Sequence, residues 1–166
     1  MRVLVAYLSQ TGNTKKVAEA IYGEITGDKE LKELNEVADL EGYDLAFIGF
    51  PINAANPATD AKAFLDAHAA GKKIAIFMTH GALEESEEAE RYLDNCRVAV
   101  ADADLVGMFD CQGEAAQAII DFLAASDNPR HRAFAELAPR TKGQPDGSRL
   151  EKARAFAREV MEKAGD

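Results

Sequence analysis

The stretch Ser9-Gln10-Thr11-Gly12-Asn13-Thr14 joins an apolar run to a helical pattern and sets the interpretation of the whole chain. The run before it, Val3–Leu8, is almost continuously apolar, which is typical of a strand buried on both faces of a sheet. After it, Ala18, Ile21 and Ile25 keep the spacing of one buried helix face. The stretch therefore forms a loop between a buried strand and the N-terminus of a helix.

Such a loop has the physical features of a phosphate-binding site. Backbone N–H groups at a helix N-terminus are unpaired and carry partial positive charge. Gly12 permits a tight turn, while Ser9, Thr11 and Thr14 add hydroxyl donors. Because the loop contains no Lys or Arg, neutral dipoles would hold the phosphate. A helix N-cap without a ligand is the alternative interpretation.

Other nucleotide-binding motifs do not match. The NTPase loop requires Gly-Lys-Ser/Thr, whereas Gly12 is followed by Asn13, and the dinucleotide fingerprint requires three spaced glycines. A receiver domain needs an acidic cluster after its first strand, and this chain has Ser9 there.

The rest of the chain alternates between short apolar runs and helical patterns. The further expected strands are Leu45–Gly49, Ile74–Met78 and Leu105–Phe109, with the more charged Lys29–Leu34 at a sheet edge. The expected helices open at Asn56-Pro57 (a cap followed by proline) and at Ser86, and the last covers 148–163. This alternation predicts a doubly wound α/β fold with helices on both faces of the sheet.

The 166 residues suit a single domain, 1–166, interrupted by one long excursion. Residues 113–147 contain three of the five prolines and an expected helix at 114–125, and otherwise indicate an extended surface segment that is functional or mobile. No apolar run approaches the ~20 residues of a membrane-spanning helix. Because a strand begins at the N-terminus, we expect a cytoplasmic protein.

The net negative charge of the chain disfavours two classes of binding partner. The net charge of −10 makes nucleic acid and anionic membranes poor ligands. Residues 126–158 are locally basic, with eight Lys/Arg against four Asp/Glu, so the molecule is expected to be bipolar. Solvation is the favoured interpretation of Arg130, Arg132 and Arg140, over a grip on an acidic substrate.

At the level of motifs, the sequence resembles the flavodoxin family. The family hallmark is Ser/Thr-x-Thr-Gly-Asn-Thr between the first strand and first helix, which residues 9–14 match in full. The likeness covers most of 2–110 and the closing helix 148–163. It implies a three-layer α/β fold, a five-stranded parallel sheet in the order 2-1-3-4-5, and one FMN where the strand order reverses.

The resemblance also implies which residues hold FMN. The phosphate would bind Ser9, Gln10, Thr11, Gly12, Asn13 and Thr14. The isoalloxazine ring would lie between a first ring loop, Pro51, Ile52, Asn53, Ala54, Ala55 and Asn56, and a second, Thr79, His80, Gly81 and Ala82. Cys111, Gln112 and Gly113 follow the fifth strand on the same rim of the sheet and are candidates for contact with the ring.

The chain departs from familiar flavodoxins at the ring. Neither ring loop carries an aromatic residue, so stacking must come from aliphatic groups, from Phe50 or from another segment. The first ring loop also lacks Gly, which leaves Asn53 or Asn56 to adopt positive φ. The 113–147 excursion resembles insertions in a divergent branch of the family.

The histidines and cysteines receive individual interpretations. A solvated loop histidine is favoured for His80 over a contact with flavin or substrate, and a boundary position is favoured for His68. Cys96 falls on a buried helical stripe and is expected to be structural. For Cys111, contact with the ring and simple core filling stay open.

These features favour an electron carrier that passes single electrons between redox proteins. No general acid, nucleophile or metal-binding set is evident, and the acidic cluster Glu84–Glu90 offers a docking face for a basic partner. The alternative is a flavodoxin-like reductase of a quinone or other small acceptor, with 113–147 as a lid. A binding domain that has lost FMN is disfavoured by the intact loop. We expect a monomer or weak homodimer.

Overall fold

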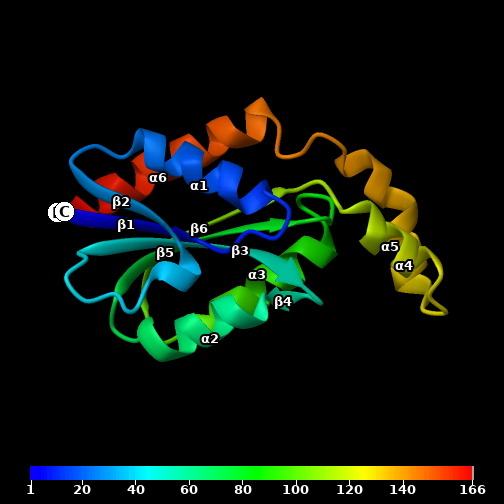
Figure 1. Cartoon of the computed structure of the whole chain (residues 1–166), viewed down its shortest axis with the longest axis horizontal. Coiled ribbons are helices and arrows are strands. Elements are labelled where there is room, and N and C mark those ends of the chain that lie inside the picture. Colours follow the sequence, from blue (N-terminus) through cyan, green and yellow to red (C-terminus); the bar gives the residue numbers. More distant parts are fainter. Residues whose placement is uncertain (166) are drawn as a thin grey trace.

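The computed structural model describes residues 1–165 and has a central parallel sheet (Figure 1). Its strands are β1 (Arg2–Tyr7), β2 (Asp28–Glu33), β3 (Leu45–Asn53), β5 (Lys73–His80) and β6 (Asp104–Gln112). They are arranged in the order β2-β1-β3-β5-β6, and the two-residue β4 (Asn56–Pro57) pairs antiparallel with β3. Counted over the five parallel strands, this is the predicted 2-1-3-4-5 order, so the predicted α/β flavodoxin-like fold is confirmed.

Two helices cover each face of the sheet. Helices α1 (Asn13–Glu24) and α6 (Gly147–Gly165) cover one face, and α2 (Thr59–His68) and α3 (Glu87–Ala99) cover the other. A 3₁₀ turn, η1 (Leu34–Glu36), follows β2. The alternating side chains of the buried strands feed two apolar clusters, one on each side of the sheet. This packing fixes the carboxyl ends of β1, β3, β5 and β6 at one rim.

The start of the second helix differs from the prediction. Asn56 and Pro57 do not open α2, because they pair with Asn53 and Ile52 across a tight hairpin. Proline lacks a backbone donor and is tolerated in such a short edge strand as well as at a helix start. Helix α2 begins two residues later, at Thr59. The expected start of the third helix at Ser86 is confirmed, because its Oγ caps α3 by accepting from the Ala89 N–H.

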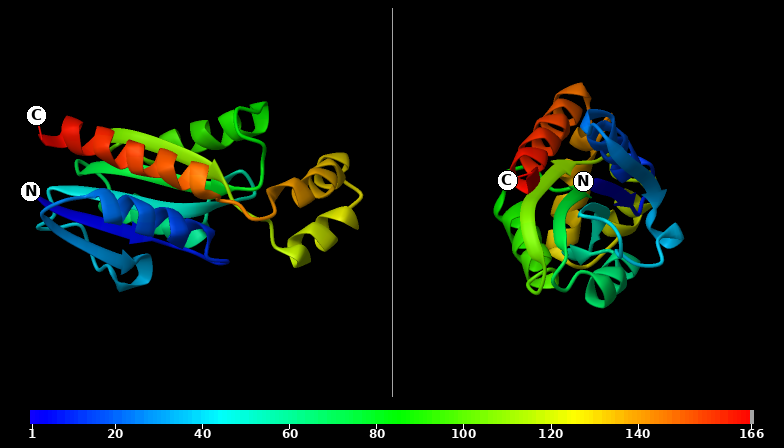
Figure 2. Two further views of the ribbon diagram at one scale, coloured as in Figure 1. Left: turned by 90° about the horizontal axis from the view of Figure 1, so that it is seen from above. Right: turned by 90° about the vertical axis from the view of Figure 1, so that its left-hand side faces the viewer.

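The excursion is more helical than expected. It contains α4 (Gln117–Ala124), α5 (Pro129–Leu137) and a 3₁₀ turn, η2 (Ala138–Thr141). The extended segment expected after residue 125 is therefore wrong, because Asn128 caps α5 and proline stands at its first position. Helices α4 and α5 contact each other and form a hairpin, residues 117–137, which we call the α4–α5 hairpin. It projects beyond the carboxyl rim of the sheet (Figure 2).

The start of the excursion is tied back to its end. The Glu114 N–H donates to the Gln144 carbonyl at 2.9 Å, and the Ala115 N–H donates to Thr141 Oγ1 at 2.9 Å. These bonds hold Glu114 and Ala115 outside the helix expected at 114–125, and α4 begins only at Gln117. Among residues 1–165, none of the helices has the length and apolar character needed to cross a bilayer.

Candidate functional site

The loop between β1 and α1 presents free backbone donors at the carboxyl rim. Ser9 Oγ accepts hydrogen bonds from the N–H groups of Gly12, at 3.1 Å, and Lys15, at 3.3 Å. Gly12 has a φ of 92°, which a residue with a side chain rarely adopts. Within residues 1–165, the backbone N–H groups of Thr11, Asn13 and Thr14 donate to no acceptor. The loop can therefore donate several hydrogen bonds to an anion.

The two threonines of this loop have different roles. Thr11 is exposed and free to contact a ligand, whereas Thr14 is buried and its Oγ1 lies 2.8 Å from Thr79 Oγ1. Thr14 faces β5 from the first turn of α1, so its hydroxyl connects the phosphate loop to the second ring loop. Lys15 and Lys16 are exposed at the start of the helix.

Gly113, which follows β6, contacts both β5 and the phosphate loop. Its N–H donates to the His80 carbonyl at 2.8 Å, and a Cβ on Gly113 would lie 2.7 Å from Asn13 Nδ2. Asn13 Nδ2 donates in turn to the Glu114 carbonyl at 2.9 Å. A side chain at position 113 would displace Asn13 from this contact, so glycine lets the three loops meet at one place.

Two adjoining cavities open at this meeting point. A small one of about 150 Å³ lies at the phosphate loop, and a larger one of about 830 Å³ lies beside it. The larger volume lies within the range of roughly 300–1,000 Å³ typical of small-molecule sites. Seven residues line both cavities: Gln10, Ile52, Asn53, His80, Gly81, Ile119 and Phe134. The two spaces therefore form one continuous site.

The first ring loop contains a strained two-residue turn at its centre. Ala54 and Ala55 have φ values of 47° and 66° and connect β3 to β4. The expectation of positive φ at Asn53 or Asn56 is therefore wrong, because the hairpin register places both asparagines in the paired strands. Asn56 Nδ2 donates to the Ala54 carbonyl at 2.9 Å, and Asn95 Nδ2 on α3 donates to the Ala55 carbonyl at 2.7 Å.

His80 is a buried strand residue, so its expected place in a solvated loop is wrong. Strand β5 continues to His80, which is 5% exposed and lies between β6 and α3. Its Nε2 is 2.9 Å from Asp110 Oδ2, and its ring centroid is 5.6 Å from that of Tyr92. Burial, followed by the neighbouring Glu88 carboxylate, raises the pKa of Tyr92 to about 12. His80 and Tyr92 both line the larger cavity.

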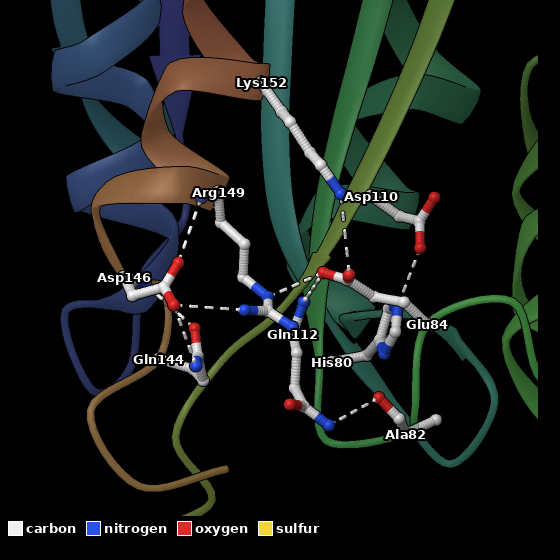
Figure 3. A network of polar contacts seen from close by, with 9 residues as sticks. All are labelled: His80, Ala82, Glu84, Asp110, Gln112, Gln144, Asp146, Arg149 and Lys152. Carbon is white, nitrogen blue, oxygen red and sulfur yellow. Dashed lines mark hydrogen bonds and ion pairs between the residues drawn. The ribbon is translucent and has the colours of Figure 1, made fainter.

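A polar network anchors the second ring loop to α6 (Figure 3). Glu84 Oε1 accepts from Arg149 Nε at 2.7 Å and from the Gln112 N–H at 3.2 Å. The Gln112 side chain donates to the Ala82 carbonyl at 3.0 Å. Asp146 holds the other side of the Arg149 guanidinium at 3.3 Å. The loop that ends β5 is thereby fixed to β6 and to the closing helix.

Ion pairs neutralise part of the acidic cluster at Glu84–Glu90. Glu84 is paired with Arg149, and Glu88 Oε1 lies 2.5 Å from Arg91 on the same helix. Glu85, Glu87 and Glu90 are exposed at the start of α3. The charge offered to solvent there is therefore smaller than the sequence suggests.

Most of the residues implied by the resemblance meet at the two cavities. Those that line them are Ser9, Gln10, Thr11, Asn13, Thr14, Pro51, Ile52, Asn53, Ala54, Ala55, Thr79, His80, Gly81 and Gly113. Five lie outside the lining: Gly12, Asn56, Ala82, Cys111 and Gln112. Gly12 and Asn56 shape their loops, Gln112 braces Ala82, and Cys111 belongs to the apolar cluster under α1 and α6.

The aromatic residues of the site come from segments that the sequence analysis did not assign. Phe50 is fully buried in the core and cannot stack on a ligand. Tyr92 on α3 and Phe122 and Phe134 on the hairpin line the larger cavity instead. Ile119, Ile120, Phe122 and Leu123 were the available signal for α4, and no local pattern marked Tyr92 or Phe134.

Both cysteine thiols are buried in the core. Burial raises the pKa of Cys96 and of Cys111 to about 12. The structural role expected for Cys96 agrees with its place on the buried face of α3, and Cys111 packs in the core on the α1 and α6 side of the sheet. Among residues 1–165 no cluster of three or more His, Cys, Asp or Glu side chains is arranged to hold a metal ion.

Comparison with known proteins places this fold and loop in a family. The flavodoxin domain model matches residues 4–158. The chain belongs to the flavodoxin family. It is 33% identical over 174 residues to the flavodoxin-like domain-containing protein BilS of Clostridioides difficile, with 99% of this chain and 98% of the relative covered.

Two solved flavodoxin structures share the architecture over nearly the whole chain, and a third flavoprotein shares it over two thirds. An archaeal flavodoxin aligns with a TM-score of 0.62 at 17% identity over all of both chains. Flavodoxin 2 of Bacillus cereus aligns with a TM-score of 0.60 at 24% identity, covering 98% of this chain and 99% of its own. A Lactobacillus acidophilus flavoprotein solved in complex with FMN aligns at 0.53 and 25% identity, over 66% of this chain and 92% of its own.

Proposed function

We propose that this flavodoxin-family protein binds one FMN and carries single electrons between redox proteins. The observation that carries the proposal is the continuity of the site: a small cavity lined by free backbone donors opens into a larger cavity between the two ring loops. A phosphate at the first and a flat ring in the second would span both. The FMN complex of the Lactobacillus acidophilus flavoprotein supports the same choice of ligand.

The residues present fit FMN. The N–H groups of Thr11, Asn13 and Thr14 and the Thr11 hydroxyl would hold the phosphate without a cationic side chain. Ile52, Asn53 and Ala54 would flank one side of the ring, and His80 and Gly81 the other. When bound, FMN supplies reversible electron transfer, and the protein's part is to position the ring and tune its potentials.

Binding is tested by titrating the apoprotein with FMN and, in parallel, with riboflavin, which lacks the phosphate. Thr11→Ala combined with Thr14→Ala removes a free hydroxyl and the buried tie to Thr79. We expect FMN affinity to fall about tenfold or more, as for the loss of a hydrogen bond to a charged group, with much less change for riboflavin. Equal FMN affinity in the double variant would remove the phosphate assignment.

The carrier role is tested by reduction of the FMN-loaded protein in steps under anaerobic conditions. A carrier is expected to take up its two electrons in separable one-electron steps and to reduce a haem or metal protein. The exposed Glu85, Glu87 and Glu90 favour a basic partner, whose association would slow as salt screens these charges.

A reductase of a quinone or other small acceptor is the second candidate. The α4–α5 hairpin favours it, because Phe122 and Leu123 line a cavity large enough for ring and acceptor together. This candidate predicts saturable oxidation of NAD(P)H by quinones in the presence of FMN. Direct two-electron reduction together with such turnover would replace the carrier role with the reductase role.

A further inference from the structure

The α4–α5 hairpin places the ring of Phe134 against Gly81 of the second ring loop. A Cβ placed on Gly81 would lie 2.4 Å from Cζ and 2.9 Å from Cε2 of Phe134. Real side chains do not approach so closely, so only glycine at position 81 leaves room for the Phe134 ring. Phe134 is half-buried and is contributed by α5, more than fifty residues further along the chain.

The hairpin also spans both cavities. Ile119 of α4 and Phe134 of α5 line the phosphate-side cavity as well as the larger one, and Phe122 and Leu123 line the larger one. Helix α4 buries none of its residues against the body of the protein, and Phe122 is 71% exposed. Exposed apolar side chains that line a cavity are typical of a binding surface, and here that surface faces the site.

The ring loops themselves carry no Phe, Tyr or Trp. The first presents Pro51, Ile52, Asn53 and two alanines to the cavities, and the second presents Thr79, His80 and Gly81. Aromatic stacking on a flat ring contributes beyond the burial of area alone. Phe134 is the phenylalanine that contacts the second ring loop at Gly81 and lines both cavities.

We propose that the α4–α5 hairpin supplies the apolar cover of the isoalloxazine ring, with Phe134, seated on Gly81, as its stacking residue. The occupant is the flavin, because Phe134 and Ile119 join the larger cavity to the phosphate-side cavity in one continuous space. This inference rests on the proposed binding of FMN. It assigns the aromatic contact with the ring to an insertion, beside the two ring loops that flank the ring.

The first test compares Phe134→Leu with Phe64→Leu, a matched change on α2 outside both cavities. Leucine preserves apolar volume and removes the stacking surface, so the affinity for FMN is expected to fall about two- to tenfold. Riboflavin affinity should fall by the same factor, because the contact is to the ring. Affinities equal to those of Phe64→Leu for both ligands would overturn the inference. Thermal melting of the apoproteins checks that each variant folds.

A second test exploits the absence of tryptophan from the chain. An indole in contact with a flavin quenches flavin fluorescence, so bound FMN should be dimmer in F134W than in the wild type. F64W should leave the emission of bound FMN unchanged. Equal emission in F134W and F64W would place residue 134 away from the ring and contradict the proposal.

A third test measures whether the effects of changes at Gly81 and Phe134 on flavin affinity depend on each other. Gly81→Ala should displace Phe134 and weaken FMN and riboflavin binding about as much as Phe134→Leu. Because both changes act on one contact, the double variant should lose less than the product of the two factors. Fully multiplicative losses would overturn the assignment. Failure of the wild-type protein to bind FMN would instead defeat the proposed function, so the two failures are distinguishable.

Discussion

Ala54 and Ala55 form a turn that normally uses residues tolerant of positive φ. Two-residue hairpin turns with φ above zero at both positions favour Asn-Gly, because a Cβ in the left-handed region costs about 1–2 kcal/mol. This chain holds two alanines there through the hydrogen bonds of Asn56 and Asn95 to their carbonyls. Strain of this kind collects at functional sites, and the cavity beside this turn agrees with that rule.

Ala55→Gly is expected to relieve this strain. The free energy of unfolding of the apoprotein should rise by about 1 kcal/mol, because glycine adopts the left-handed conformation without steric cost. Urea denaturation measures the change. The control, Ala155→Gly on the exposed face of α6, should lower stability by roughly 0.5–1 kcal/mol. If Ala55→Gly lowers stability as the control does, the turn is not strained.

The two cysteine thiols should resist alkylation in the native protein. Burial raises the pKa of Cys96 and Cys111 to about 12, and only the thiolate is an effective nucleophile. Mass spectrometry after treatment with iodoacetamide at pH 8 should show no adduct on the folded chain and two on the urea-unfolded chain. Rapid labelling of folded Cys111 would contradict its place in the core.

At the scale of elements, the second ring loop depends on its anchor to α6. Glu84→Gln keeps an oxygen acceptor for the Gln112 N–H but removes the charge that holds Arg149, and both partners are partly buried. The free energy of unfolding should fall by about 1–2 kcal/mol, as for a charge-assisted hydrogen bond.

The matched control is Asp66→Asn, which removes an exposed ion pair with Lys62 on α2. Exposed pairs contribute roughly 0.2–1 kcal/mol, and helical i,i+4 pairs lie at the lower end. Urea midpoints that shift equally in Glu84→Gln and Asp66→Asn would show that the Glu84 network does not stabilise the loop.

The edge strand β2 carries a carboxylate whose ionisation links stability to pH. Hydrogen bonds from Lys32, Arg2 and Tyr43 lower the pKa of Glu30 to about 2, from an ordinary value of 4.5. A carboxyl group with a lower pKa in the folded state stabilises it above the ordinary pKa, and this contribution is lost as pH falls from about 4.5 toward 2. Glu30→Gln should therefore flatten the acid side of the stability–pH curve. An unchanged curve would exclude the pairing.

The elements that sequence predicts well are those with one dominant signal. The apolar runs that became β1, β3, β5 and β6 are short and continuous, and a run of this length is typical of a strand in a parallel sheet. Asn56-Pro57 carries a signal that suits both a helix start and a short edge strand. Long-range pairing with β3 decides between them, and no local pattern records it.

The residues of the site also divide into those that a local motif predicts and those that depend on long-range contacts. The phosphate loop is a local motif and could be assigned from 9–14, whereas the contact of Phe134 with Gly81 joins segments far apart in the chain. The burial of His80 likewise depends on Asp110 and Tyr92, which approach from β6 and α3. Such juxtapositions arise from tertiary packing and cannot be read from sequence periodicity.

At the scale of the whole molecule, the α4–α5 hairpin is a module added to a complete three-layer fold. Its base is closed by hydrogen bonds from Glu114 to Gln144 and from Ala115 to Thr141, so the chain enters and leaves at one place. The apolar clusters that residues 1–165 form on the two faces of the sheet contain no residue of α4 or α5. We therefore expect the sheet and its covering helices to fold without the hairpin.

Replacement of residues 117–137 by a short Gly-Ser linker tests this independence. The shortened chain should unfold in one cooperative transition, with a free energy of unfolding lowered by about 1–2 kcal/mol, since the deletion removes the packing of the half-buried Phe134 on Gly81. Far-ultraviolet circular dichroism and urea denaturation measure both expectations. Retained folding with weakened flavin binding would assign the hairpin to the site alone, because the core remains complete. Loss of cooperative unfolding would show instead that the hairpin completes the core and is not an independent cover.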